Sequence, residues 1–240
     1  MNAEFNGKSL DAEDVHRVQP VTRAVPSVGR LAKPTQRLAV AYDPIDPRCE
    51  KIRDLRAELL LRREPGDGAG VIALLSPGAG DGRSQLAAEL AIAFAQLDRP
   101  TLLVDADLRH PSQHLLFAAD NKAGLSQAIE NGTTPYLHSV EGLRHLSLLT
   151  SGPTPDNASA LLLNKRFAAL VEEWRESFDF VVLDTAPITQ YSDGLAVASL
   201  VKRVLVLSRA RHTPYKESRD MLRRLAAIRS QIVGAVLNHF

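Results

Sequence analysis

The chain has 240 residues, 45% of them hydrophobic, with 29 basic residues against 28 acidic ones; this composition allows one sizeable domain and argues against a nucleic-acid partner. The single cysteine, Cys49, excludes an internal disulfide, and the sequence contains neither a secretory signal nor an apolar run of the roughly 18–20 residues that a membrane helix needs. We therefore expect a soluble, cytoplasmic protein.

The N-terminal stretch differs in composition from the rest of the chain. Residues 1–40 mix polar, charged and proline residues without a sustained apolar period, so we interpret residues 1–42 as a flexible arm and residues 43–240 as one folded domain. From Pro47 to about residue 63, apolar side chains recur at steps of three and four residues, which predicts a one-sided helix. Residues 62–68 then form a predicted loop.

The remainder alternates between short apolar runs and helical periods such as Leu86, Leu90 and Phe94. The apolar runs, which we interpret as strands, are Val71–Leu75, Thr101–Val104, Leu146–Leu149, Phe180–Leu183, Val204–Leu207 and Ile232–Leu237. Strands separated by amphipathic helices predict an α/β fold of three layers, in which helices flank a mainly parallel central sheet. Ligands bind such sheets beyond the carboxyl ends of the strands, so the residues that follow each strand are the candidates for a functional site.

The first candidate is the glycine-rich turn after the first strand, where residues 76–84 read S-P-G-A-G-D-G-R-S. Glycines let backbone N–H groups turn inward around a phosphate, and the dipole of the following helix adds to the attraction. The turn is similar to the P-loop pattern G-x-x-x-x-G-K-[ST], whose last hydroxyl, here Ser84, ligates Mg²⁺. Pro77 replaces the first glycine of that pattern and Arg83 replaces its lysine. For this segment alone, an ordinary strand-to-helix turn is the alternative.

Acidic residues follow two further strands. Asp105 and Asp107 come after Thr101–Val104; their side chains point the same way in an extended chain and would repel each other unless a cation or a proton lies between them. Asp184 follows Phe180–Leu183 in the form of a Walker B strand with its terminal acid. One hydroxyl with one or two carboxylates suits Mg²⁺, which prefers oxygen ligands and keeps several waters. Each acid alone could cap a helix, but the three segments together predict a P-loop NTPase fold with a magnesium–nucleotide site.

With these motifs the chain resembles the cytoplasmic kinase domain of the bacterial tyrosine kinases of exopolysaccharide and capsule biosynthesis, within the MinD/ParA-like P-loop class. The resemblance covers roughly residues 43–240. Leu103–Pro111 is similar to the Walker A′ motif of the family, and Asp184–Pro187 is similar to its Walker B motif, with Ala186 in place of the usual first proline. Residues 50–56, E-K-I-R-D-L-R, match the E-x-x-R-x-x-R motif that the family uses for ring assembly. Further landmarks are Gly124-Leu125-Ser126, Ser151-Gly152 and Gly234–Asn238.

The resemblance implies an ATP-dependent protein-tyrosine kinase that regulates polymerisation and export of the polysaccharide. It implies catalytic roles for Arg83, at the lysine position, and for Asp105 or Asp107, which would accept the proton of an attacking tyrosine hydroxyl. The implied Mg²⁺ ligands are Ser84, Asp107 and Asp184. The implied ATP-binding residues are Gly78, Ala79, Gly80, Asp81, Gly82, Arg83, Ser84 and Gln85.

The resemblance also implies partners. A membrane-embedded polysaccharide co-polymerase, or chain-length regulator, would recruit the chain to the inner face of the plasma membrane. Copies of the chain would assemble through Glu50, Arg53 and Arg56, which step along one helix face.

The chain departs from the family pattern at two points. Arginine at position 83 is expected to weaken phosphoryl transfer, and a C-terminal cluster of tyrosines is missing. The tyrosines are scattered, at Tyr42, Tyr136, Tyr191 and Tyr215. One alternative is therefore an ATP-binding pseudokinase that regulates the same machinery. The other, a ParA- or MinD-like positioning ATPase, is disfavoured because the signature lysine of those proteins is replaced here by Gly78.

Overall fold

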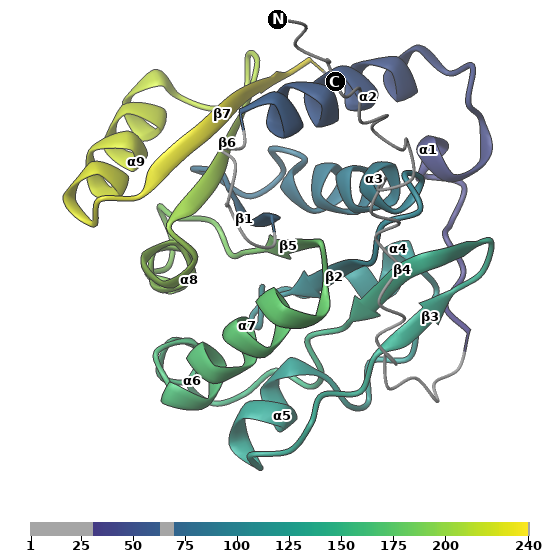
Figure 1. Ribbon diagram of the computed structural model, residues 1–240. Coiled ribbons are helices and arrows are strands. Elements are labelled where there is room, and N and C mark those ends of the chain that lie inside the picture. Colours follow the sequence, from purple (N-terminus) through teal and green to yellow (C-terminus); the bar gives the residue numbers. More distant parts are fainter. Residues whose placement is uncertain (1–30, 63–69, 240) are drawn as a thin grey trace, which may run out of the picture.

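The computed structural model describes residues 31–62 and 70–239. Within these ranges a sheet of seven strands has the order β3-β4-β2-β5-β1-β6-β7, and all neighbours are parallel except β3 and β4 (Figure 1). The strands are β1 (Gly70–Leu75), β2 (Thr101–Asp105), β3 (His138–Val140), β4 (Leu143–Leu149), β5 (Phe180–Asp184), β6 (Arg203–Arg209) and β7 (Gln231–Asn238). The helices are α1 (Ala39–Tyr42), α2 (Pro47–Leu61), α3 (Arg83–Ala95), α4 (Gln113–Leu116), α5 (Leu125–Glu130), α6 (Ala158–Leu162), α7 (Lys165–Ser177), α8 (Asp193–Val201) and α9 (Tyr215–Ala227).

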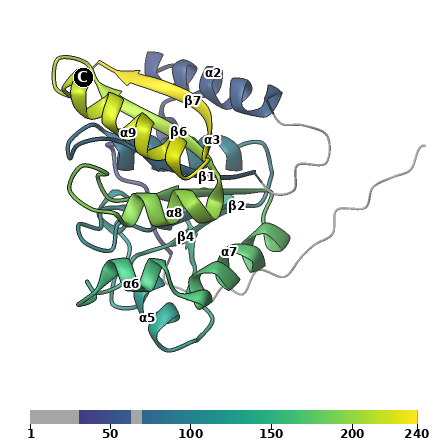
Figure 2. The ribbon, with the colours of Figure 1, turned by 90° about the vertical axis from the view of Figure 1, so that its left-hand side faces the viewer.

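The helices form one layer on each face of the sheet. Helices α1–α4 lie on one face and α5–α9 on the other, as the two perpendicular views show (Figures 1 and 2). Each face has its own hydrophobic core, because successive side chains of a strand point to opposite faces. In β1, for example, Val71 and Ala73 belong to the core under α5–α9, whereas Ile72 and Leu74 belong to the core under α1–α4. The predicted three-layer α/β fold with a mainly parallel sheet is confirmed.

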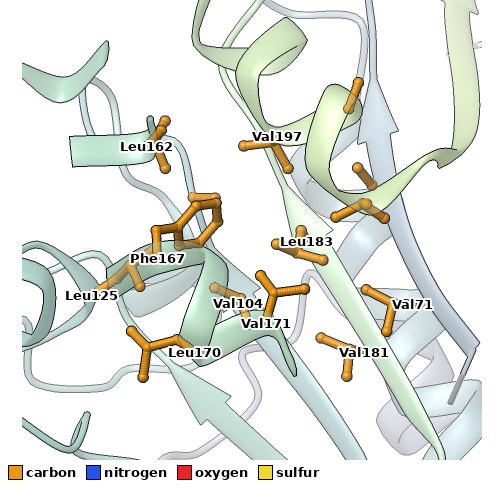
Figure 3. Packing of buried hydrophobic residues seen from close by; sticks show 14 of the residues in the cluster. Val71, Val104, Leu125, Leu162, Phe167, Leu170, Val171, Val181, Leu183 and Val197 are labelled. Carbon is orange, nitrogen blue, oxygen red and sulfur yellow. The ribbon is translucent and has the colours of Figure 1, made fainter. Parts of the chain in front are cut away.

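Helix α7 illustrates how an amphipathic helix covers the sheet. Its buried side chains Phe167, Leu170 and Val171 belong to the same core as the strand residues Val181 and Leu183, and Val171 lies next to these two (Figure 3). The helix begins after Asn164, whose side chain accepts a hydrogen bond from Arg166 N, as expected for an N-cap asparagine. The burial of these large apolar side chains removes them from water and fixes β5 beneath the helix.

The segment before α2 packs against the domain. Ala32 forms an isolated parallel bridge with Val140, Lys33 N donates to the Phe117 carbonyl (2.7 Å), and Leu38 is fully buried. Residues 31–42 were expected to belong to a flexible arm. Because these contacts hold them against the domain, the structured part of the chain begins no later than residue 31. Hydrophobic burial and backbone hydrogen bonds, which single-residue composition does not reveal, hold this segment in place. Residues 1–30 of the predicted arm, and residues 63–68 of the predicted loop, lie outside the described residues.

The remaining predicted elements agree with the structure at the level of helix and strand. Each of the six predicted strands lies within an observed strand, and the predicted helix after the glycine turn is α3, which begins at Arg83. The helix predicted from Pro47 is α2, which begins after Asp46, whose side chain accepts a hydrogen bond from Arg48 N. The sequence did not indicate β3, a short antiparallel strand at the edge of the sheet, or single out α8.

Candidate functional site

The candidate site lies at the carboxyl ends of β1, β5 and β2, which are neighbours in the sheet although they are far apart in the chain. The turn after β1 contains Gly80 and Gly82 with φ angles of +79° and +94°, in the left-handed region that favours glycine. Helix α3 begins directly after this turn. Its N-cap residue is Gly82, which has no side chain to cap the first turn, so the N–H groups there are available to a phosphate.

The acid within this turn, Asp81, is buried and braces the turn. Its Oδ2 accepts a hydrogen bond from Gly78 N (2.9 Å), and its Oδ1 accepts one from Thr213 Oγ1 (2.6 Å). The backbone carbonyl of Asp81 accepts a third from Asn238 Nδ2 (2.9 Å). Thr213 follows β6 and Asn238 ends β7, so two distant segments hold the turn. Asp81 was predicted to bind the nucleotide, but the sequence did not indicate Thr213.

Ala79, Gly80 and Gln85, which were also predicted to bind the nucleotide, differ in what they can offer to a ligand. Ala79 and Gly80 are exposed at the tip of the turn, where a ligand can reach their backbone. The Gln85 side chain is engaged elsewhere, because its Nε2 donates to Glu89 Oε1 (3.0 Å) and to the Arg37 carbonyl (3.2 Å). Only the backbone of Gln85, in the first turn of α3, is therefore left for a nucleotide.

The guanidinium of Arg83 lies between the two carboxylates that were predicted to bind Mg²⁺. Its Nε donates to Asp184 Oδ1 (3.2 Å), its Nη2 donates to Asp107 Oδ2 (3.3 Å), and its Nη1 donates to Ser76 Oγ (2.8 Å). The side chain is only 7% exposed. Two buried carboxylates without a cation would repel each other, and Arg83 supplies the compensating charge.

Asp184 ends β5 and is fully buried. Burial raises the pKa of its carboxyl, whereas the charge of Arg83 and hydrogen bonds from Gln113 and Ser84 lower it. The Ser84 hydroxyl and the Asp184 carboxylate, both predicted as metal ligands, are therefore in contact. A hydroxyl and a carboxylate in this position are the donor atoms that Mg²⁺ prefers.

Asp105 organises the loop that follows β2. Its Oδ1 accepts a hydrogen bond from Asp107 N (3.2 Å), and its Oδ2 accepts hydrogen bonds from Ser112 N and Gln113 N (2.9 Å each). Burial and then the charge of Asp184 raise the pKa of Asp105 well above its ordinary value, which the backbone donors only partly offset. Both oxygens of Asp105 are thus bound to its own loop.

Asp107 differs from Asp105 in the direction of one oxygen. Its Oδ1 accepts hydrogen bonds from Arg109 N (3.3 Å) and His110 N (3.0 Å), but its Oδ2 faces the guanidinium of Arg83. Of the two acids predicted as proton acceptors, Asp107 therefore has the oxygen that is directed into the cluster.

Arg109, the arginine of the D-x-D-x-R sequence, is held by an acid that the sequence did not single out. Asp193, at the start of α8, accepts hydrogen bonds from Arg109 Nε (2.6 Å) and Nη2 (3.3 Å) and is itself buried. Ser159 Oγ of α6 contacts both residues, and the Arg109 guanidinium lies 4.3 Å from the centroid of the Tyr191 ring. Because no helix was predicted at this position, the only sequence signal for Asp193 was an acid that directly follows a serine.

Gln113 is a second residue that sequence reasoning missed. Its Nε2 donates both to the Ser84 carbonyl (2.9 Å) and to Asp184 Oδ2 (2.8 Å), and the residue is fully buried. It therefore joins the glycine turn and the Asp184 strand end. A glutamine after proline and serine, at the start of the four-residue helix α4, gives no sequence signal for such a position.

The donor set fits one Mg²⁺ ion that also binds phosphate. Ser84, Asp107 and Asp184 offer oxygen atoms only, and the single positive charge of Arg83 offsets part of the negative charge of the two carboxylates. Within residues 31–62 and 70–239, no group of three or more His, Cys, Asp or Glu side chains is arranged to hold a metal ion. This finding is compatible with Mg²⁺, which takes one or two carboxylates and completes its coordination with substrate phosphates and water.

Comparison with known proteins identifies the family. The ParA family model, described as NUBPL iron-transfer P-loop NTPase, matches residues 69–239. The putative tyrosine-protein kinase CapB of Staphylococcus aureus is 34% identical over 191 residues, which cover 79% of this chain and 83% of CapB. The chain belongs to the bacterial tyrosine kinases, within the ParA-like P-loop NTPases. The resemblance predicted from its motifs is thereby confirmed.

Solved structures separate this family from its distant relatives. The kinase domain of the Escherichia coli tyrosine kinase ETK matches with a TM-score of 0.80 and 27% identity, over 92% of this chain and 84% of that one. The cell division ATPase MinD of Pyrococcus furiosus matches with a TM-score of 0.60 and 17% identity, over 70% of this chain and 71% of that one. The second likeness is one of fold alone. The comparisons therefore do not favour the positioning ATPase.

The helix that carries the E-x-x-R-x-x-R sequence of these kinases is α2. Glu50 and Arg53 form an ion pair (3.0 Å) at its surface, whereas Arg56 Nη1 donates to the Ala93 carbonyl of α3 (2.8 Å). Arg56 is thus engaged within the chain, while Glu50 and Arg53 are accessible. In the part of the chain that the structure describes, no helix is long and apolar enough to span a membrane.

Proposed function

We propose that the chain is an ATP-dependent protein-tyrosine kinase that regulates polymerisation and export of an exopolysaccharide or capsule. The observation that carries the proposal is the convergence of Ser84, Asp107 and Asp184 from three separate segments around the cationic Arg83. The resemblance to CapB and to the ETK kinase domain supports the same activity.

The proposed reaction transfers the γ-phosphoryl group of ATP to a tyrosine hydroxyl. The hydroxyl oxygen forms a bond to the γ-phosphorus, the bond to the β,γ-bridging oxygen breaks, and ADP leaves. Bound Mg²⁺ would neutralise charge on the β- and γ-phosphate oxygens. The uncapped start of α3 would receive the phosphates, and Ser84 and Asp184 would hold or orient the ion and its waters.

Asp107 is the better candidate for the group that accepts the proton of the tyrosine hydroxyl. Its Oδ2 would be released when Arg83 moves from the carboxylates to the phosphates, while both oxygens of Asp105 are bonded to backbone N–H groups. We infer that Asp105 acts indirectly, by fixing the loop that carries Asp107.

We further propose that the chain works with a membrane-embedded polysaccharide co-polymerase, which recruits it to the inner face of the plasma membrane. Self-association would use the α2 surface around Glu50 and Arg53. The contact of Arg56 with the Ala93 carbonyl makes Arg56 a support of the α2–α3 packing.

Two measurements on the full chain test the function. MgADP at about 100 times its dissociation constant should raise the free energy of unfolding by about 2.7 kcal/mol, which a thermal scan detects. ATP with the cytoplasmic tail of the co-polymerase should yield phosphotyrosine. No thermal shift would refute the nucleotide site, whereas a shift without phosphotyrosine would identify an ATP-binding pseudokinase of the same machinery.

A further inference from the structure

The amide of Gln113 has a fixed orientation at the centre of the site. Of the two hydrogen-bond partners of its Nε2, the Ser84 carbonyl can only accept, and the ionised carboxylate of Asp184 can only accept as well. Rotation of the amide by 180° would bring Oε1 against these two oxygens. The NH₂ group must therefore face them, and Oε1 must point elsewhere.

This Oε1 atom is buried and has no hydrogen-bond partner among the described residues. A buried amide oxygen without a donor costs roughly 1–3 kcal/mol, so native proteins rarely leave one unpaired unless a ligand or a water occupies the space. The backbone N–H of Gln113 is bound to Asp105 Oδ2, which holds the residue at this position.

The position of Oε1 beside Asp184 suits a role in metal binding. Because Nε2 lies 2.8 Å from Asp184 Oδ2, Oε1 of the same amide lies no more than about 5 Å from that carboxylate oxygen. A water bound to Mg²⁺ lies about 2.1 Å from the ion and donates strongly to acceptors a further 2.7–2.8 Å away. Gln113 thus carries an unpaired acceptor beside a carboxylate that is predicted to bind the ion, where a metal-bound water would need one.

We propose that Gln113 positions the Mg²⁺ ion of the nucleotide complex, by accepting a hydrogen bond from a metal-bound water through Oε1 while its NH₂ group orients Asp184. The proposal rests on the proposed function, because it deepens the same nucleotide site. Gln113 is a positioning residue: it does not touch the reacting atoms. Residues that orient metal ligands and waters in this way typically contribute 10–100-fold to metal affinity.

The test compares ADP binding by isothermal titration calorimetry in Mg²⁺ and in EDTA, using the full chain. The ratio of the two dissociation constants, EDTA over Mg²⁺, is the magnesium factor. Gln113→Met keeps the approximate length of the side chain and removes its hydrogen bonds, and it should lower the magnesium factor by about 10–100-fold. The matched control is Gln127→Met, because Gln127 also bonds through its amide, to Gly124 N and Ser126 Oγ of α5 and its N-cap. It should leave the magnesium factor unchanged.

The results separate this inference from the proposed function. A wild type without ADP binding, or without a magnesium factor, would refute both. In a second outcome, the wild type has a magnesium factor, but Gln113→Met lowers it no more than Gln127→Met does. That outcome would overturn only the role of Gln113, because a residue with a purely structural role weakens ADP binding equally in Mg²⁺ and in EDTA. If Gln113→Met does not fold, Gln113→Leu replaces it. Leucine also lacks both hydrogen-bonding groups, so its magnesium factor should fall by about 10–100-fold as well, and a factor equal to that of the wild type would overturn the proposal.

Discussion

Arg83 and Asp184 are joined by a hydrogen bond of 3.2 Å between Nε and Oδ1, across 101 residues of sequence. Arg83 stands at the position of the P-loop lysine, yet its guanidinium is bound to the two carboxylates that were predicted to bind the metal ion. In the proposed reaction, Arg83 exchanges these partners, from carboxylates to phosphates. This exchange would link the charge of the carboxylate cluster to catalysis.

The first prediction concerns the rate of phosphoryl transfer. Arg83→Lys replaces a planar fork by a compact charge that fits between the transferring and leaving oxygens, so turnover should rise by up to roughly 10²-fold. ADP affinity should change little, because either cation pairs with phosphate. Phosphate release and phosphotyrosine formation measure the effect. Equal or slower turnover of the lysine variant would mean that the site is adapted to arginine.

The second prediction concerns stability. Arg83→Met leaves Asp107 and Asp184 buried without a cation, which should lower the free energy of unfolding by roughly 3–5 kcal/mol in EDTA. Mg²⁺ should restore part of this loss. Urea denaturation measures both values, and Arg144→Met is the control, because its ion pair with Asp98 is exposed and contributes at most about 1 kcal/mol. Equal effects of the two substitutions would contradict the role of Arg83 as a counter-ion.

The third prediction separates the glycine turn from the metal. Thr213→Val removes the hydroxyl that donates to Asp81 Oδ1 and leaves a buried carboxylate with one donor fewer. ADP affinity should fall roughly 10–100-fold, the equivalent of one hydrogen bond to a charged group. The loss should be the same in Mg²⁺ and in EDTA, in contrast to Gln113→Met. A loss confined to Mg²⁺ would show that Thr213 acts through the metal instead.

The fourth prediction is a dependence of stability on pH. Glu89 of α3 is buried and accepts hydrogen bonds from Arg48 Nε (2.8 and 2.7 Å). Burial raises the pKa of Glu89 above its ordinary value of 4.5, although Gln85 and Arg48 oppose this effect. The folded chain then binds more protons than the unfolded chain. The contribution of Glu89 to stability is therefore complete below pH 4.5 and is lost as the pH rises through the folded-state pKa.

Glu89→Gln removes this titration. The free energy of unfolding of the wild type minus that of the variant should consequently decrease from about pH 4 to about pH 7, as measured by urea denaturation. An increase over the same range would mean that Arg48 dominates over burial and depresses the pKa.

The fifth prediction concerns the α2 surface. The double variant Glu50→Ala/Arg53→Ala removes the exposed ion pair and should convert nucleotide-bound oligomers to a smaller species in sedimentation velocity. Lys51→Ala/Asp54→Ala is the matched control, because this pair is also exposed on α2 at i and i+3. If both double variants sediment like the wild type, α2 does not mediate assembly.

Some parts of the candidate site could be predicted from the sequence, and others could not. The glycine turn, Asp105, Asp107 and Asp184 were predictable because each follows an apolar strand, and strand order then brings them to one edge of the sheet. The strands themselves were predictable because buried parallel strands are near-continuous apolar runs. Strand β3 was not, because three residues at an edge carry no period.

Contacts made across the fold were beyond such reasoning. Gln113 and Thr213 contribute through hydrogen bonds to Asp184 and Asp81, which lie 71 and 132 positions away in the sequence, and these contacts depend on tertiary packing. The engagement of Arg56 with Ala93 likewise follows from the docking of α2 on α3. A helix motif gives the face on which a residue lies but not the partner that it finds there.

The hydrogen bond from Asn238 to the Asp81 carbonyl spans 157 residues. During synthesis, the glycine turn leaves the ribosome long before β7, so it lacks this brace until the last strand has been added to the sheet. A growing chain therefore has the residues of its nucleotide loop without the support that holds them. Phosphate-binding capacity should consequently mature only after β7 has joined the sheet.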